Sequence, residues 1–295
     1  MKEIKVYKDI RKCKSKIINS IRKFGFSPEH NYYHYLYKQT PHKRCIFLDF
    51  GQKKGVMAML NRKNSVWSVV NGILAPPEDK SDVFMGFIDY ALSRKKAKKV
   101  YVEARADLKS IIFKALKNSK YKASMNYTLY WPVYDIQKWD EKLSGRQWKK
   151  FRNIRNRFYN HSSIRARKPR KIDKNALEAI LFSWLKRRHP RDSVDSSYYL
   201  NVIDNNFRGF DMARALSING GLCSISAGWK IPNSDGFYLG IGIFNYRHKD
   251  MGDFVNLDDF MHLKKIGCKQ IDLGGSDKAI LHFKMKFKPE KIYKT

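Results

Sequence analysis

Residues 237–287, FYLGIGIFNYRHKDMGDFVNLDDFMHLKKIGCKQIDLGGSDKAILHFKMKF, decide the fold of this chain. They predict a strand, a polar turn, a helix, a short buried strand, a glycine-rich turn and a last amphipathic helix, at 237–244, 245–252, 253–266, 269–273, 274–277 and from 277 on. This order makes an α/β crossover, in which both helices begin at the edge where the strands end. Free backbone N–H groups and the positive ends of the helix dipoles face outward there. We therefore expect the ligand site at this edge.

Upstream of the crossover, the second half of the chain predicts helices followed by an antiparallel meander. The helices are expected at 144–158, 173–188 and 196–207, with a basic loop or edge strand at 165–171 and strands at 212–218 and 222–230. Asn219-Gly220 and Asp235-Gly236 are strong hairpin signals between these strands.

The first half predicts the same order of elements. It begins with a basic helix over 1–26 and an aromatic segment, 31–37, that is either a strand or a helical turn. Strands and helices follow at 45–50, 55–60, 65–74, 81–93 (helix), 99–104, 107–118 (helix) and 125–133. A repeated order argues for duplication of one fold. We predict an α/β (α+β) protein with domains at 1–139 and 140–295, each a mixed, mainly antiparallel sheet flanked by helices.

The composition favours a polyanionic partner. The 295 residues include 60 Lys+Arg against 27 Asp+Glu, a formal net charge of +33. Such a charge attracts nucleic acid or an anionic membrane surface, although a general lysine bias would also produce it. The four cysteines form no CxxC pair, which predicts a reduced, cytoplasmic setting without a metal site. No apolar run is long enough for a signal peptide or a transmembrane segment.

Two segments of the second half resemble a known group of enzymes. Residues 271–276, IDLGGS, followed by 281–287, LHFKMKF, resemble the Asp-x-Gly-Gly and Phe-Lys-x-x-Phe ending of the Fem-type peptidyltransferases. Residues 144–158, SGRQWKKFRNIRNRF, resemble the basic helix that opens the second GNAT unit of Fem proteins and of the phosphatidylglycerol lysyltransferase soluble domain. The resemblance implies two tandem GNAT-like domains and transfer of an aminoacyl group from aminoacyl-tRNA to an amine or hydroxyl acceptor.

The turn at 245–252 departs from the ordinary GNAT pattern. Acetyl-CoA enzymes of this fold place a Gln/Arg-x-x-Gly-x-Gly/Ala loop after the central strand, whereas this chain has NYRHKDMG there. Without the paired small residues, acetyl-CoA is disfavoured, and we expect no cofactor and an aminoacyl-tRNA donor. The coiled-coil arm of Fem proteins is also absent from the sequence, which leaves the acceptor open.

The resemblance implies that Lys284 is a catalytic cation, although a solvated helix lysine would look the same in sequence. Asp272 ends the second strand of the crossover, where it either orients or deprotonates the incoming nucleophile or caps the following turn. Five further residues are candidates for substrate binding, against alternatives of turn geometry or core packing. They are Gly274, Gly275, Phe283, Asn245 and Arg247.

The helix at 144–158 is the candidate nucleic-acid surface. Its basic residues have almost no acidic neighbours, which favours phosphate contacts over ion pairs. They are Arg146, Lys149, Lys150, Arg152, Arg155 and Arg157. Together with the aminoacyl transfer that the resemblance implies, this surface leads us to expect an aminoacyltransferase that binds tRNA. The alternatives are a GNAT-fold N-acyltransferase or modifying enzyme that acts on nucleic acid, and a nucleic-acid-binding protein without catalytic activity.

Overall fold

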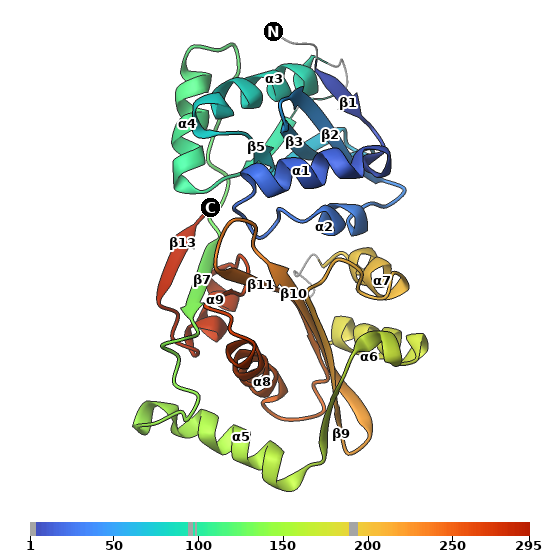
Figure 1. Ribbon diagram of the computed structural model, residues 1–295, viewed down its shortest axis with the longest axis vertical. Coiled ribbons are helices and arrows are strands. Elements are labelled where there is room, and N and C mark those ends of the chain that lie inside the picture. Colours follow the sequence, from blue (N-terminus) through green and yellow to red (C-terminus); the bar gives the residue numbers. More distant parts are fainter. Residues whose placement is uncertain (1–3, 94–96, 98, 189–193) are drawn as a thin grey trace.

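The computed structural model describes residues 4–93, 97, 99–188 and 194–295, and it places two sheets one after the other along the long axis (Figure 1). The first sheet has the order β1-β2-β3-β4-β6, with β5 beside β3. Only the β4–β6 pairing is parallel. Its elements are β1 (Lys5–Tyr7), α1 (Lys14–Phe24), α2 (Tyr32–Tyr37), β2 (Lys43–Gly51), β3 (Lys54–Asn61), β4 (Val66–Val70), β5 (Ile73–Leu74), α3 (Lys80–Leu92), β6 (Lys99–Glu103) and α4 (Ala106–Lys117).

The second sheet has the order β13-β7-β12-β11-β10-β9-β8, again with one parallel pairing, between β11 and β12. Its elements are β7 (Tyr130–Asp135), α5 (Lys149–His161), β8 (Ile164–Arg167), α6 (Lys174–Lys186), α7 (Ser196–Asp204), β9 (Met212–Ile218), β10 (Gly221–Lys230), β11 (Gly236–Phe244), α8 (Met251–Lys265), β12 (Gln270–Asp272), α9 (Lys278–Met285) and β13 (Lys291–Lys294). Short 3-10 turns lie at Ile10–Cys13, Pro77–Asp79, Arg146–Trp148 and Pro169–Lys171. Both sheets are thus mixed and mainly antiparallel, as predicted.

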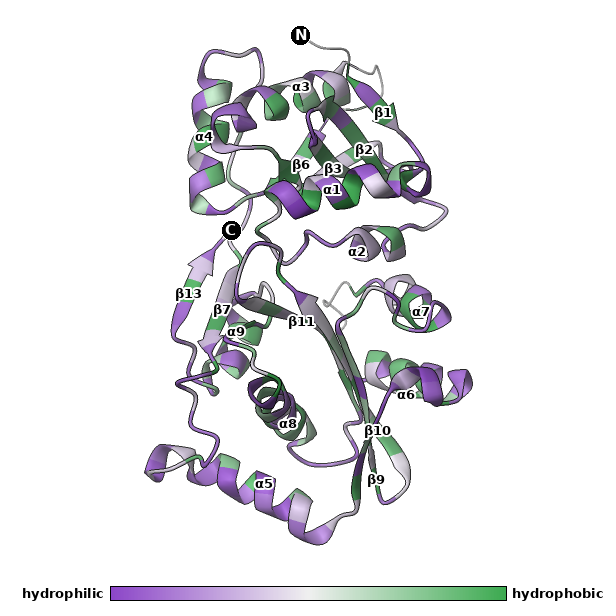
Figure 2. Ribbon diagram, in the orientation of Figure 1, coloured by the Kyte–Doolittle hydropathy of each residue, from purple (hydrophilic) through white to green (hydrophobic). Residues whose placement is uncertain are grey.

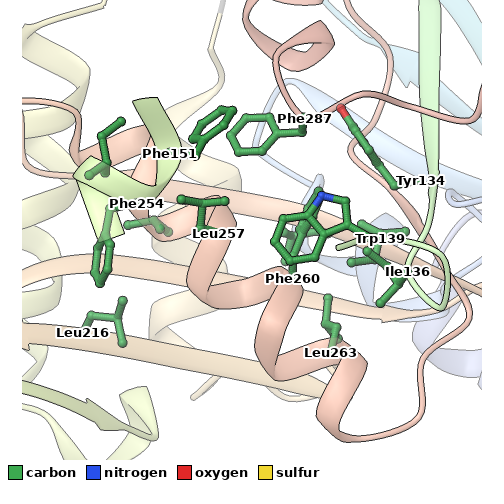
Figure 3. Packing of buried hydrophobic residues seen from close by; sticks show 14 of the residues in the cluster. Tyr134, Ile136, Trp139, Phe151, Leu216, Phe254, Leu257, Phe260, Leu263 and Phe287 are labelled. Carbon is green, nitrogen blue, oxygen red and sulfur yellow. The ribbon is translucent and has the colours of Figure 1, made fainter. Parts of the chain in front are cut away.

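Helices cover both faces of the second sheet. On one face, α5 and α8 pack around Phe254, Leu257 and Phe260, with Phe287 also buried among them (Figure 3). On the other face, α6 and α7 pack against Ile225 and other apolar side chains of β10 and β11, and Tyr37 of α2 joins them from the first half of the chain. The side chains that alternate along these strands therefore fill two separate cores.

In the first half, one sequence prediction is wrong in detail and one alternative that the sequence left open is decided. The helix expected over 1–26 begins only at Lys14, because residues 5–7 pair with β2 and the Asp9 carboxylate caps a 3-10 turn by accepting the Arg11 N–H. The aromatic segment after Asn31 is a helix rather than a strand, since the Asn31 side chain accepts the N–H groups of Tyr33 and His34.

The strand expected at 125–133 begins later, at Tyr130, and it belongs to the second sheet. It pairs antiparallel with β12 on one side and with β13 on the other. The domain boundary predicted after residue 139 counts this strand with the first domain, whereas its hydrogen bonds are all in the second. The C-terminal segment, through β13, therefore lies beside the chain that connects the two sheets (Figure 1).

Two kinds of feature are absent from the described residues. None of their helices has the length and hydropathy needed to cross a bilayer. No group of three or more His, Cys, Asp or Glu side chains among them is arranged to hold a metal ion.

Candidate active site

The two parallel strand pairs differ in how far they stay together. In the first domain, all five residues of β4 pair with β6, from Val66 with Lys99 to Val70 with Glu103. In the second, β11 pairs with β12 only from Gly236 to Tyr238, and it then continues alone on this side to Phe244. Backbone groups on this edge of β11 are therefore not paired with β12. This separation makes the second domain the better candidate for a ligand site at the strand ends.

Lys284 lies at the point of separation. It projects from α9, whose first turn is capped by Asp277 accepting the Ile280 N–H. The Lys284 side chain is 9% exposed, and its Nζ donates to the carbonyl oxygens of Leu273 (2.6 Å) and Gly274 (2.8 Å). The alternative of a solvated helix lysine is thus wrong.

Burial lowers the pKa of Lys284 to about 8, against the opposing fields of Asp272 and Asp277. At neutral pH the ammonium group is still mostly protonated. It has three N–H donors, and two of them bond to the carbonyls of the turn. The third has no hydrogen-bond partner among the described residues.

Asp272 caps the turn, which is one of the two roles between which the sequence could not choose, and its role toward the nucleophile stays a prediction. Its Oδ1 accepts the Gly274 N–H at 2.7 Å and so caps the turn, while its Oδ2 accepts the Tyr293 hydroxyl at 2.7 Å. The side chain is 2% exposed, and burial raises its pKa to about 6 despite these bonds. An acid with a pKa this close to neutral can exchange a proton during a reaction at physiological pH.

The first domain reaches Asp272 through Tyr293, which the sequence analysis missed. Arg105 Nη2, at the start of α4, donates to the Tyr293 hydroxyl at 3.0 Å, and its guanidinium lies 4.2 Å from the centre of the Tyr293 ring. Trp131 stacks on the same ring. No local pattern marks either residue, because Tyr293 follows the recognised motif and Arg105 lies far from it in sequence.

Gly274 and Gly275 are required by packing in the turn. Gly274 has φ +83°, and a Cβ there would lie 3.2 Å from the Tyr238 ring; a Cβ on Gly275 would lie 2.8 Å from Trp131. The alternative of turn geometry explains Gly274, close packing against Trp131 explains Gly275, and a role of either glycine in substrate binding stays a prediction. Phe283 packs against Phe287 at the edge of the core, in agreement with the core-packing alternative.

Asn245 and Arg247 lie at the other end of β11. The Asn245 side chain accepts the Arg247 N–H at 2.9 Å, which shapes the loop between β11 and α8. Both residues line a cavity of about 380 Å³ together with residues of α6 such as Phe182 and Lys186. The structure therefore groups these two predicted residues with α6 rather than with the turn that holds Lys284.

The basic residues of the predicted nucleic-acid surface divide into two groups. Arg152 and Arg155 donate to backbone carbonyls of the preceding loop, and Arg157 bonds to Lys249 O and pairs with Asp250. These three arginines fix the loops around α5. The others, Arg146, Lys149 and Lys150, are exposed, and α5 is mostly hydrophilic along its length (Figure 2). The second group is therefore the better placed to contact phosphates.

A buried ion network lies on the α5 side of the second sheet, away from the turn. Arg214 of β9 contacts Asp258 (2.7 Å) and Asp259 (2.8 Å) of α8. The Ser226 hydroxyl also donates to Asp259, and the Tyr159 hydroxyl donates to Asp258. Burial raises the pKa of Asp259 to about 7. Because both carboxylates have their partners within the fold, we regard the network as a link between α8 and the sheet.

Comparison with known proteins supports the fold assignment. No protein-family model and no curated protein matches the sequence. Among solved structures, L-PGS from Bacillus licheniformis aligns with a TM-score of 0.67 at 13% identity, over 95% of this chain and 90% of its own. FemX aligns at 0.63 and 11%, over 99% and 96%, and a tandem GNAT protein from the clavulanic acid biosynthesis pathway at 0.58 and 8%, over 99% and 98%. The resemblance stated from the sequence, and the prediction of two tandem GNAT-like domains, are confirmed at the level of the fold.

Proposed function

We propose that this protein is an acyltransferase that moves an aminoacyl group from aminoacyl-tRNA to an amine or hydroxyl acceptor. The observation that carries the proposal is the environment of Lys284, a buried cation held by two backbone carbonyls where β11 and β12 separate. The similarity in fold to L-PGS and FemX supports it. The loop at 245–252, which lacks the small residues of a coenzyme A site, favours the tRNA donor over acetyl-CoA.

The chemistry needs a positioned nucleophile and a donor aimed at the developing oxyanion. The acceptor nitrogen or oxygen attacks the ester carbonyl carbon of the donor, and the carbonyl oxygen becomes an oxyanion. The unpartnered N–H of Lys284 stabilises that charge, while Asp272 takes the proton that the nucleophile loses. The ester C–O bond then breaks, and the ribose oxygen leaves with that proton. The products are uncharged tRNA and the aminoacylated acceptor.

Release of a radiolabelled amino acid from a pool of charged tRNAs, measured with and without candidate acceptors, tests the proposal. We expect deacylation that depends on an acceptor, with the label recovered on that acceptor. Lys284→Met should slow transfer about a hundredfold or more, the usual cost of losing one oxyanion donor. The exposed Lys278, on the same helix, provides the matched control Lys278→Met. Tight RNA binding without turnover would instead support a non-catalytic nucleic-acid-binding protein.

A further inference from the structure

The cavity between α6 and the β11–α8 loop is distinct from the turn that holds Lys284. Its volume of about 380 Å³ falls within the range of roughly 300–1,000 Å³ that is usual for ligand pockets. On one side it is lined by the C-terminal end of α6, from Phe182 to Arg187, and on the other by residues 245–247. Nothing in the mechanism above uses the α6 residues.

The charged side chains that line this cavity are all basic. They are Lys186, Arg187 and Arg247, and no Asp or Glu is among the described lining residues. The nearest acid along the loop, Asp250, is already paired with Arg157. Three cations around one cavity without a local counter-charge favour an anionic ligand.

Two aromatic rings lie beside these cations. Phe182 is 51% exposed and Tyr246 is 43% exposed, and both line the cavity. The buried side of α6 carries Leu181 and Trp184, and Phe182 lies outside it. Packing of the core therefore does not explain an aromatic ring at this position. Phe182 and Lys186 are separated by one helical turn, so a ring and a cation share the same face. An anion that carries a flat, stackable group meets both features, and a nucleotide is such a ligand.

The loop that lines the cavity is connected both to the basic helix α5 and to the turn that holds Lys284. Arg157 of α5 donates to Lys249 O at 2.8 Å, which attaches the basic helix to this loop. From the loop, β11 leads back from Phe244 to Tyr238, opposite Asp272. Six residues of strand span about 20 Å, a distance that an extended single strand of a few nucleotides can cover.

We propose that this cavity binds a nucleotide of a single-stranded RNA end, a few positions before the terminus that carries the aminoacyl group. Phe182 and Tyr246 stack on its base, and Lys186, Arg187 and Arg247 contact its phosphates. The terminus then extends along the unpaired edge of β11 toward Lys284, and this last part of the inference rests on the proposed aminoacyl transfer.

A short single-stranded RNA with 2-aminopurine near its 3′ end tests the proposal, because stacking on a protein ring quenches the fluorescence of this base. We expect quenching on binding, and about tenfold weaker binding without quenching for Phe182→Leu and Tyr246→Leu, since a stacked base is lost. Phe182→Trp, which keeps an aromatic ring at this position, should bind and quench the RNA as the wild-type protein does. Phe113→Leu replaces a similarly exposed ring on α4 and is the matched control. The replaced rings are exposed, and a thermal melt confirms that each variant is folded.

The outcomes separate this inference from the proposed function. Unaltered affinity and quenching in the Leu variants, or no binding of the RNA by the wild-type protein, would overturn it. If an acidic peptide competes as well as the RNA and depends equally on Phe182, the cavity binds peptides and the nucleotide assignment is wrong. Quenching that depends on Phe182 in a protein that shows no transfer would leave the nucleotide site standing and remove the transferase reaction.

Discussion

Replacing Tyr293 with Phe should move the acid limb of the pH dependence of transfer upward. Asp272, with a pKa of about 6, must be ionised to accept a proton, so activity should rise with pH through about 6. Lys284, with a pKa of about 8, must be protonated to stabilise the oxyanion, so activity should fall above about 8. The wild-type profile should therefore be bell-shaped, with its maximum near neutral pH.

The Tyr293 hydroxyl stabilises the ionised form of Asp272 through a hydrogen bond of 2.7 Å. A bond to a charged group contributes about 1.5–3 kcal/mol, and one pH unit corresponds to about 1.4 kcal/mol. Since Asp272 is almost fully buried, solvent screens this bond little. Its loss should raise the pKa of Asp272 and move the acid limb upward by about one to two pH units. The other charges that act on Asp272, Arg105 and Glu29, stay in place. The alkaline limb, which Lys284 sets, should move less and downward, because Asp272 raises the pKa of Lys284 less once it is partly protonated.

Single-turnover transfer measured from pH 5 to 9, after subtraction of spontaneous ester hydrolysis, gives both limbs. Carbon-13 NMR of the Asp272 carboxyl reports the same titration without any substrate. Tyr127→Phe removes a hydroxyl from an exposed tyrosine of the first domain and should leave the profile unchanged. An acid limb and an NMR titration that stay in place in Tyr293→Phe would refute the claim that this hydroxyl sets the charge of Asp272.

Three further predictions concern the surface, the core and the turn. Replacing Arg146, Lys149 and Lys150 with Ala should reduce the slope of log K for RNA binding against log salt by about two. The same replacement of Lys114, Lys117 and Lys120 on the first domain should change this slope little. Equal slopes for the two triple variants would exclude α5 from the interface. Arg214→Met leaves Asp258 and Asp259 buried without their cation and should lower the free energy of unfolding by about 3–5 kcal/mol. Urea titrations measure this loss, and an unchanged unfolding midpoint would mean that these two ion pairs are dispensable. Gly274→Ala and Gly267→Ala both place a side chain at positive φ, at a cost of about 1–2 kcal/mol. Of these two positions, only a Cβ at Gly274 would have the Tyr238 ring within 4 Å. A larger loss of thermal stability for Gly274→Ala than for Gly267→Ala therefore measures that contact. Equal losses in the two variants would show that the ring moves aside.

Local patterns in the sequence predicted the crossover but not the pairing between distant segments. Strand alternation and turn residues placed β9, β10 and β11 within a residue of their observed bounds, because these signals are local. The residues 5–7 were taken as helix and β7 was counted with the first domain, because their partners, β2 and β12, lie about 40 and 140 residues away.

The same limit applied to the candidate site. Lys284 and Asp272 were identified because they stand in a short motif that has a known family pattern. Tyr293 and Arg105 carry no such motif, and only the folded chain brings them to Asp272. Phe182 could have been noticed as an apolar residue off the buried side of α6, but its role depends on the loop that faces it.

The crossover occurs in both halves of the chain, but the length over which its parallel strands pair differs between them. After β4, the Asn71 N–H bonds to Glu103 O and the chain returns to pair β5 with β3, so the parallel strands stay hydrogen-bonded to their ends. In the second half, β11 has nine residues and β12 has three, so a parallel partner is missing for most of β11. The first domain can therefore offer little unpaired backbone to a ligand at this position, whereas the second can. What the first domain contributes instead is Arg105, whose charge reaches Asp272 through the Tyr293 hydroxyl. A movement that separates the two domains would break this contact and remove the opposing fields of Arg105 and Glu29 from Asp272, so the arrangement of the domains affects the pKa of Asp272.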